Sequence, residues 1–394
     1  MRALRELSYK SMPNQYSKIR DVHHAQKPSI LWGTLSGNYW RHRSMGETIH
    51  HATDDLKFKE LQTHAAENLK LWEKQKIAPP HKVEVVHRDF GDVALEMTKK
   101  HGKIYPILNM ANSLFPGGAA LEGGSAQEES LWHRSSCVRS LLSTKGIFYD
   151  EKRGCFLYDK NFRNLVNGQE KMSPEELESL GRRLGIEIPA AYKVFIGEEP
   201  QVYFRGPEIL FPTSLEDATS GKQFVADSAL SYAFLPKHQI FPFFELRSAA
   251  PELVTRKIDS NDKEAVSEYT QDLSRRIAAQ LDTLLEKGKT NAILGAWGCG
   301  SFKNDPELVA RIYRKEIEKR AQHFQHLVFP IIDVENVTNF QVFKKYLDGL
   351  ELGHLAEKTH SQNKTPYNRY SLYASDQKEN VPSQEETKSR CTLL

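Results

Sequence analysis

The stretch that decides the fold runs from Ile104 to Leu142 and reads IYPILNMANSLFPGGAALEGGSAQEESLWHRSSCVRSLL. It opens on an apolar run, Ile104–Leu108, that is typical of a buried strand. A loop with glycines follows, and the segment Gln127–Leu142 then places its apolar residues towards one side, which predicts a helix. A strand that leads through a loop into a helix is the unit from which parallel sheets are built.

The same alternation of strand and helix recurs along most of the chain. We expect further strands at Val83–Val86, Phe241–Leu246, Asn291–Leu294 and Leu327–Ile332, and further helices at Asp92–Lys100, Asp262–Lys287, Pro306–Lys319 and Phe340–Leu350. The sequence therefore predicts an α/β fold with three layers, α/β/α, around a mixed, largely parallel central sheet.

Two segments flank this core domain, which we expect to span residues 81–355. Residues 1–80 are polar, show loosely helical spacing of leucines and end at Pro79-Pro80, so they predict an N-terminal helical layer packed on the core. Residues 356–394 are polar with few aliphatic side chains, and such a segment buries too little apolar area to fold. We expect a flexible tail there.

Residues 150–205 interrupt the alternation. Within them Ser173–Glu176 forms a capping-box start with proline at the first helical position, and Leu177, Leu180 and Leu184 follow on one face. We expect a helical insertion on the surface of the core domain.

The composition excludes several classes of protein. Of 394 residues, 39% are hydrophobic and 27% charged, so the chain can bury a core and is not wholly disordered. Its 54 basic and 51 acidic residues are interleaved and give a net charge of +3, which argues against direct nucleic-acid binding. No stretch approaches the ~18 apolar residues of a membrane span, and no apolar region follows the basic N-terminus. We expect a soluble, cytoplasmic protein.

No metal site is expected. His42, His50 and His51 lie closest together among the histidines, but no carboxylate–histidine grouping accompanies them, so we expect them on the surface. The cysteines are scattered, without zinc-ligand spacing, at Cys137, Cys155, Cys299 and Cys391.

Two glycine loops, Asn109–Ala119 and Gly295–Phe302, each follow a predicted strand and lead into a helix. Glycine lets a backbone approach a ligand and turn its amide groups towards it, so the two loops indicate a phosphate-containing ligand between them. The second loop lacks the third glycine of a dinucleotide turn, and Ser220–Gln223 lacks the residues of a P-loop. A nicotinamide oxidoreductase and a P-loop NTPase are therefore disfavoured, and simple tight turns remain the alternative.

Two acids, Glu128 and Glu129, stand at the expected start of the next helix. Neighbouring residues on a helix point in different directions, so the two carboxyl groups must do different work. One could hold sugar hydroxyls while the other donates a proton to a leaving oxygen. The alternative is that both only complement the helix dipole.

The span Asn109–Ser136 resembles the signature of poly(ADP-ribose) glycohydrolases, especially the microbial type of the macrodomain superfamily. That signature is a triple glycine, six to eight residues and then Gln-Glu-Glu, and here Ala120–Ala126 supplies seven residues. The second loop, followed by a helix that Asn304 or Asp305 would cap, is similar to that family's phosphate loop. The resemblance spans roughly residues 30–350 and implies a macrodomain-like fold.

The resemblance implies a role for each matching residue. Glu129 matches the catalytic acid, and Glu128 matches the glutamate that orients the ribose, so both are expected to be catalytic. The implied ADP-ribose-binding residues are Asn112, Gly117, Gly118, Ala119, Gln127, Gly298, Cys299, Gly300, Ser301 and Phe302. No metal or cofactor is implied.

The implied function is hydrolysis of the glycosidic bond of ADP-ribose attached to poly(ADP-ribose) or to a modified protein, with release of ADP-ribose. Glu129 would protonate the leaving oxygen and then assist the attack of water. Ala119 departs from the family pattern, because it adds a methyl group where a third glycine is expected. The alternative is a reader that binds ADP-ribose without cleaving it, and the linkage that is cleaved is left open.

The last four residues, Cys391-Thr392-Leu393-Leu394, fit a C-a-a-X box that favours geranylgeranylation, with a chance match as the alternative. Contact with a membrane is expected only if Cys391 is prenylated. The Glu-rich polar tail also raises the hypothesis of an effector delivered into a host cell.

Overall fold

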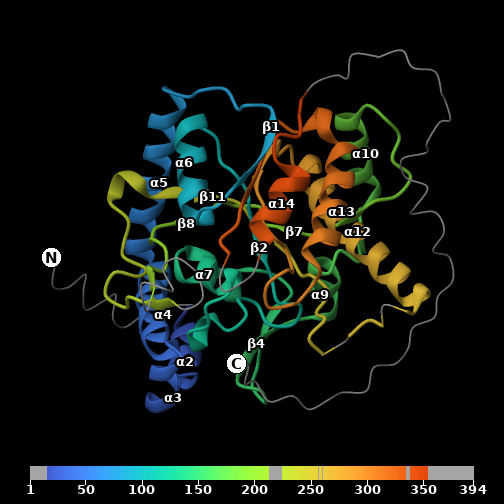
Figure 1. Cartoon of the computed structure of the whole chain (residues 1–394). Coiled ribbons are helices and arrows are strands. Elements are labelled where there is room, and N and C mark those ends of the chain that lie inside the picture. The colour runs from blue at the N-terminus through green and yellow to red at the C-terminus, as the bar shows by residue number, and fades with distance from the viewer. Residues whose placement is uncertain (1–15, 213–223, 256, 260, 334–337, 354–394) are drawn as a thin grey trace, which may run out of the picture.

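The computed structural model describes residues 16–353 except for 213–223, 256, 260 and 334–337 (Figure 1). The predicted tail, with Cys391, lies outside the described residues. None of the helices within the described ranges is long and apolar enough to cross a membrane.

A six-stranded sheet forms the centre of the fold. Its strands lie in the order β1 (Lys82–Val86), β14 (His326–Pro330), β13 (Asn291–Ile293), β2 (Ile107–Met110), β12 (Glu245–Ser248) and β7 (Phe195–Ile196). Neighbouring strands are parallel from β1 to β12, and β7 is antiparallel to β12. The prediction of a mixed, largely parallel sheet is confirmed.

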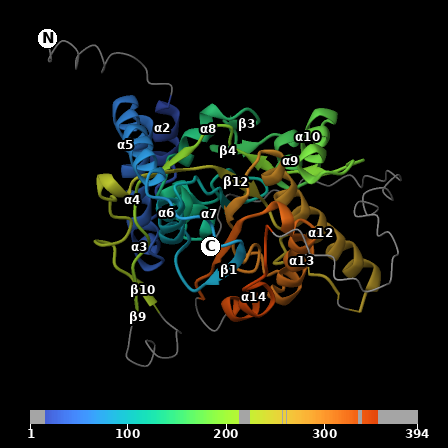
Figure 2. The same cartoon turned by 90° about the horizontal axis from the view of Figure 1, so that it is seen from above.

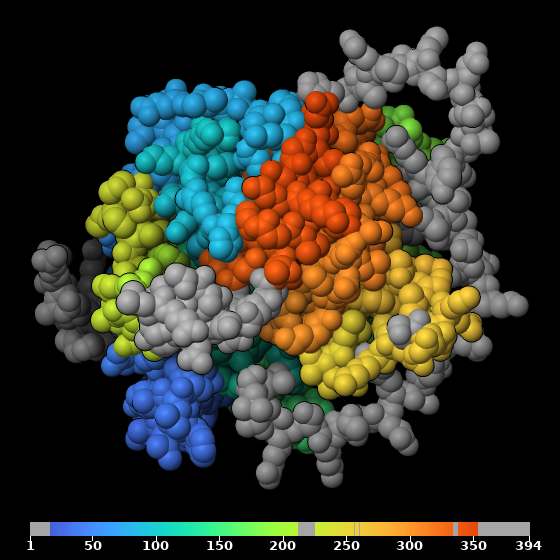
Figure 3. Space-filling model, viewed as in Figure 1, coloured from blue at the N-terminus to red at the C-terminus, as the bar shows by residue number. Residues whose placement is uncertain are grey.

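Helices cover both faces of the sheet (Figure 2). One face carries α10 (Pro174–Leu184), α12 (Lys263–Glu286), α13 (Pro306–Glu318) and α14 (Asn339–Leu347), and the other carries α4 (Asn38–Thr53), α5 (Asp55–Glu73), α6 (Phe90–His101) and α7 (Gln127–His133). Side chains alternate along each strand, so Leu327 and Phe329 join the first core and Val328 joins the second. On the outside, α14 fills the surface between β1 and α13 (Figure 3). The predicted three layers are confirmed.

The N-terminal helices pack against the helix that carries the two glutamates. Before β1 the structure places α2 (Ser17–Ala25), α3 (Ile30–Leu35), α4 and α5. The Thr48 hydroxyl of α4 donates to the His133 carbonyl at the end of α7, at 2.5 Å. The buried Arg205 guanidinium donates to the Ser44 carbonyl at 2.6 Å and to Thr48 Oγ1 at 2.9 Å. The first bond fixes α4 beside α7, and the other two join α4 to Arg205.

His42 does not lie on the surface as expected. Its ring stacks on that of His23, with centroids 3.9 Å apart, and both residues are buried. The Nε2 atom of each ring lies 2.8–2.9 Å from the backbone carbonyl oxygen of the other residue. The pair joins α2 to α4, and burial lowers the pKa of His23 to about 4.

Residues 150–205 contribute to the sheet and its core as well as to the surface. They contain the expected helix α10 and a further helix, α9 (Lys160–Val166). They also contain β4 (Cys155–Tyr158), β5 (Glu170–Lys171), β6 (Tyr192–Lys193), β7 and β8 (Gln201–Tyr203). Leu180 and Leu184 of α10 are buried in the same core as α12, because the leucine stripe faces that helix. The expected surface insertion therefore includes one edge strand of the central sheet.

Most predicted elements differ from the structure by one to three residues at an end, and three of them differ for a local reason. β2 begins after Pro106, since proline cannot donate to the ladder. The predicted helix Gln127–Leu142 is broken into α7, a 3-10 turn at Ser136–Arg139 and α8 (Ser140–Ser143), where the Ser135 side chain bonds to backbone groups on both sides. The predicted strand Phe241–Leu246 is divided between β11 (Phe241–Phe243), which pairs with β8, and β12. The remaining strands are β3 (Ile147–Asp150), β9 (Leu210–Pro212) and β10 (Phe224–Ala226).

Candidate active site

Both glycine loops leave the same edge of the sheet. The first follows β2 and the second follows β13, and these two strands are parallel neighbours. A Cβ atom added to Gly295 would lie 2.5 Å from the Met110 Cε atom, so the loops start in contact with each other. This is the arrangement expected for a crevice between them.

The first loop turns its glycines against α7. The side-chain oxygen of Asn112 accepts the N–H groups of Leu114 and Phe115 and so shapes the turn. Gly117 has φ +82° and lies against the Trp132 ring, which would be 2.5 Å from an added Cβ. Gly118 has φ +54°, and a Cβ there would lie 2.2 Å from Glu129 Oε1 and 3.2 Å from Glu128 Oε2. Gly118 therefore lies directly against both carboxyl groups.

Ala119 occupies the third position of the loop without backbone strain. Its φ is −96°, a value open to any L-residue, so the methyl group requires no shift of the loop. Its N–H donates to Glu129 Oε1 at 2.9 Å. The alanine that departs from the triple glycine thus still contacts one of the two glutamates through its backbone.

Glu128 is held on three sides by N–H donors. Its Oε2 accepts the Asn112 N–H at 2.6 Å, and its Oε1 accepts the Gly117 N–H at 3.0 Å and the Asn109 side-chain amide at 3.3 Å. The residue is 3% exposed. Burial, followed by the negative charge of Glu129, raises the pKa of Glu128, whereas the surrounding N–H groups favour its ionised form.

Glu129 has a different environment. Its Oε1 accepts the Ala119 N–H, and its buried Oε2 has no hydrogen-bond partner among the residues that the structure describes. Burial raises the pKa of Glu129. An unpaired carboxyl oxygen with a raised pKa is suited to hold and release a proton.

Gln127 faces the sheet. Its side-chain oxygen accepts the Met110 N–H at 2.8 Å, and its side-chain nitrogen donates to the Leu108 carbonyl at 2.8 Å. Both bonds go to β2, so the amide fixes the start of α7 on the strand that precedes the loop. With both ends of its amide engaged, Gln127 positions the two glutamates that follow it.

A buried ion pair lies behind Glu128 that the sequence analysis did not identify. Glu245 and Arg247 of β12 are 2% and 0% exposed, with Arg247 Nε 2.8 Å from Glu245 Oε1. The Asn109 amide nitrogen donates to Glu245 Oε1 at 2.7 Å. The available signal was the presence of two charged residues inside the apolar run FFELRS.

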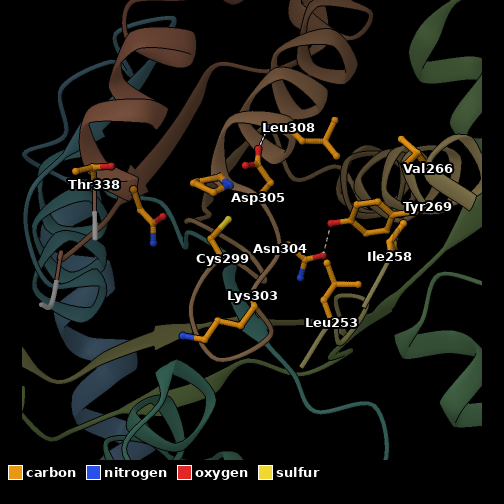
Figure 4. A pocket seen from close by; sticks show the side chains of 12 residues that line it. Leu253, Ile258, Val266, Tyr269, Cys299, Lys303, Asn304, Asp305, Leu308 and Thr338 are labelled. Carbon is orange, nitrogen blue, oxygen red and sulfur yellow. Dashed lines mark hydrogen bonds between the residues drawn. The ribbon is translucent and has the colours of Figure 1, made fainter. Parts of the chain in front are cut away.

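The second loop is held by Asn304 and Asp305. The Asn304 side chain donates to the Gly298 and Pro251 carbonyls and accepts from the Tyr269 hydroxyl at 2.8 Å (Figure 4). Asp305 Oδ1 accepts the Leu308 N–H at 2.7 Å and caps α13, as one of the two predicted caps. Gly298 has φ +76° and begins the tight part of the turn.

The remaining residues of the second loop differ in exposure. Cys299 is buried, Phe302 is half-buried, and Gly300 and Ser301 are exposed. An added Cβ on Gly300 would meet no atom of the described residues within 4 Å. Open space therefore lies beside the exposed tip of this loop, as access for a ligand requires.

An open pocket of about 670 Å³ flanks the second loop on the side of α12. Apolar side chains, including Leu253, Ile258 and Val266, form one wall, and Cys299 lies across from them (Figure 4). Lys303, with φ +59°, extends away from the apolar wall. Glu128 and Glu129 do not line this pocket, so the two glutamates and this pocket lie at different places around the loops.

Comparisons with solved structures find similar chains among bacterial enzymes. A mutant of poly(ADP-ribose) glycohydrolase from Thermomonospora curvata aligns with a TM-score of 0.47 and 19% identity, over 78% of this chain and 99% of that one. Poly(ADP-ribose) glycohydrolase from Deinococcus radiodurans in complex with ADP-ribose aligns with a TM-score of 0.41 and 21% identity, over 72% and 90% of the two chains. No curated protein matches the sequence.

The family comparison covers the part of the chain that holds the first loop and both glutamates. It includes α7 with Gln127, Glu128 and Glu129, and also β2 with Asn109. The resemblance identified from the sequence is confirmed there, because residues 41–161 match the family model of the catalytic domain of microbial-type poly(ADP-ribose) glycohydrolases (PARG).

Proposed function

We propose that the protein hydrolyses the glycosidic bond of ADP-ribose attached to poly(ADP-ribose) or to a modified protein and releases ADP-ribose. The observation that carries the proposal is the difference between the two adjacent glutamates. Glu128 has both oxygens engaged by N–H donors, whereas Glu129 has one buried oxygen without a partner. The match of residues 41–161 to a glycohydrolase catalytic domain supports the same reaction.

The hydrogen bonds indicate which glutamate carries the proton. Two buried carboxyl groups that both contact the Gly118 position are unfavourable when both are ionised, so one proton is retained. On Glu128 that proton would bind an oxygen that already accepts an N–H group, and it would weaken that hydrogen bond. On Glu129 the free Oε2 can hold it, which makes Glu129 the general acid.

The reaction proceeds with Glu129 acting twice. It donates its proton to the leaving oxygen as the bond between that oxygen and the anomeric carbon breaks, through an oxocarbenium-like transition state. The carboxylate then accepts a proton from the water that attacks the anomeric carbon, which restores the acid. The N–H donors of Glu128 favour its carboxylate against the burial that raises its pKa, and as a carboxylate it accepts hydrogen bonds from ribose hydroxyls and orients the sugar.

We assign the two glycine loops to the binding of the diphosphate and the terminal ribose. Gly117, Gly118 and Ala119 lie beside the two carboxyl groups, where the terminal ribose must be for Glu129 to act. Gly298 to Phe302 are assigned to the diphosphate and the far side of that ribose. Backbone N–H groups of such loops bind anionic phosphates without a charged side chain.

The proposal is tested by measuring ADP-ribose release from poly(ADP-ribose) and from proteins mono-ADP-ribosylated through defined linkages. We expect release by the wild type and none by Glu129→Gln, whose ADP-ribose affinity should be retained because the amide keeps the shape of the acid. Glu128→Ala should lose both ribose binding and turnover. Glu178→Gln, at an exposed acid of α10, is the matched control and should behave as the wild type.

The outcomes separate the competing functions. Release by the wild type alone would establish the hydrolase, and the consumed substrate would identify the linkage. ADP-ribose binding without release from any substrate would favour the reader. Turnover by Glu129→Gln would contradict the assignment of the general acid.

A further inference from the structure

The buried ion pair of β12 lies on the face of the sheet that carries α7. Glu245 and Arg247 are two residues apart and therefore project from the same face of the strand. Arg247 Nη2 donates to Glu245 Oε2 at 2.8 Å and to the Ser140 hydroxyl at 2.5 Å. The guanidinium also lies 5.4 Å from the centroid of the Trp132 ring. An ion pair with so little exposure is costly to bury, and stability alone gives weak reason to keep one.

The Asn109 amide links this pair to Glu128. Its two N–H bonds point to Glu245 Oε1 at 2.7 Å and to Glu128 Oε1 at 3.3 Å. An amide nitrogen has two hydrogens, so both are used and the side chain cannot rotate without breaking one bond. Removing the charge of Glu245 or of Arg247 therefore acts on the donor that holds Glu128.

The charges of the cluster are unequal. Glu128, Glu129 and Glu245 are three buried acids, and Arg247 is the cation that pairs with Glu245 and acts on Glu128. Burying a carboxylate away from water strongly favours its protonated form unless a positive charge or N–H donors compensate. Burial and the negative charge of Glu129 raise the pKa of Glu128, and the positive charge of Arg247 lowers it.

We propose that Glu245 and Arg247 are positioning residues that keep Glu128 ionised and correctly placed, so that the catalytic proton resides on Glu129. The inference rests on the proposed function and extends it to a second layer of residues behind the site. In this proposal the pair does not touch the substrate, because the Asn109 side chain lies between Glu128 and Glu245.

Two groups that lie near the ion pair are neutral near pH 7. The Cys137 thiol and the Tyr158 hydroxyl lie near the pair, and burial raises the pKa of both, so they remain protonated. The negative charge of Glu122 acts on Glu129 from the first loop and raises its pKa. The ionisation of Glu128 is therefore the step most sensitive to the charges of β12.

The test uses the fact that the two halves of the pair have opposite charges. Arg247→Met removes the cation, so Glu128 should take up its proton at a higher pH, and the acidic limb of the kcat/KM profile should move upward by about one pH unit. Glu245→Gln removes the competing anion but keeps an acceptor for Asn109, so the same limb should move downward by a similar amount. Arg247→Lys keeps the charge and should leave the limb near its wild-type position.

A matched pair elsewhere controls for stability. Arg320 and Asp282 form an ion pair between the end of α13 and α12 that is equally buried, with Nε 2.7 Å from Oδ1. Arg320→Met and Asp282→Asn should lower the free energy of unfolding while leaving the acidic limb in place. The inference would be overturned if Arg247→Met and Glu245→Gln behaved like these two controls, with lower stability and an unshifted acidic limb. The role of Glu245 and Arg247 would then be structural alone.

A second measurement does not depend on turnover. Carboxyl-¹³C labelling of glutamate, with the Glu128 resonance assigned from Glu128→Gln, follows the protonation of that residue directly by NMR. We expect opposite shifts of its midpoint in Arg247→Met and Glu245→Gln, and equal midpoints in wild type and both variants would refute the inference. A wild type without hydrolase activity but with these opposite shifts would contradict the proposed function alone.

Discussion

Replacing Gly118 with alanine should damage the site in a way that a glycine of similar conformation elsewhere does not. The new Cβ atom would lie 2.2 Å from Glu129 Oε1, well inside van der Waals contact, so the carboxyl group has to move. That movement breaks the 2.9 Å bond from the Ala119 N–H. The backbone also has to keep φ +54°, which alanine adopts with difficulty.

The two effects can be separated by a control. Gly185, at the end of α10, has φ +65°, and no atom of the described residues lies within 4 Å of an added Cβ. Gly185→Ala therefore meets only the backbone penalty, about 1–2 kcal/mol. Gly118→Ala adds the loss of a hydrogen bond by a largely buried group, about 1–3 kcal/mol. Its free energy of unfolding should therefore fall by about 1–3 kcal/mol more than that of the control.

The effect on activity should exceed the effect on stability. Displacing a general acid by about 1 Å can lower turnover about 100-fold, whereas Gly185→Ala leaves the site unchanged. Urea unfolding gives the stabilities, and single-turnover release of ADP-ribose gives the rates. Equal destabilisation of the two variants, together with wild-type turnover by Gly118→Ala, would refute the contact on which the assignment of the first loop depends.

Three further predictions concern the support of the site. Gln127→Ala leaves the Met110 N–H and the Leu108 carbonyl without their side-chain partner, so chemical denaturation should show a loss of about 1–3 kcal/mol. The folded state holds His23 neutral down to about pH 4 while the unfolded state takes up a proton near 6.5, so stability should fall by about 3 kcal/mol as the pH is lowered through this range, and His23→Phe should flatten that part of the pH profile of the melting temperature. Asp305→Ala removes the cap of α13 and should cost about 1 kcal/mol, measured by urea unfolding, whereas Asp305→Asn should retain most of the stability.

The sequence predicted the order of strands and helices because the relevant signals are local. An apolar run before a glycine loop and a leucine stripe after it are visible within about 20 residues, and the layers follow from their alternation. The end of α7 was missed, although Ser135 offers the backbone a competing hydrogen bond. β7 was missed because a strand of two residues, Phe195–Ile196, has no measurable periodicity.

The site was predictable only in part, for a different reason. Gln127 and the two glutamates were predicted from the resemblance to the family signature, and the two glutamates also from their place at the start of a helix, but their partners lie on other strands. The bonds from Gln127 to Leu108 and Met110, and from Asn109 to Glu245, join residues 17 to 136 positions apart. No local pattern reports which side chains the sheet brings together across such separations.

The division of work that we propose for Glu128 and Glu129 follows from where a short helix meets a loop. Consecutive residues of α7 point in different directions, so Glu128 turns to the N–H groups around β2 while Glu129 turns to the backbone of Ala119. The donors that surround Glu128 favour a carboxylate, and the unpaired oxygen of Glu129 favours a carboxylic acid. Exchanging the roles would require the glycine loop to offer three donors to Glu129 and to leave Glu128 unpaired. The proposed roles of the two glutamates therefore depend on the N–H donors of the loop and of β2 as much as on the glutamates themselves.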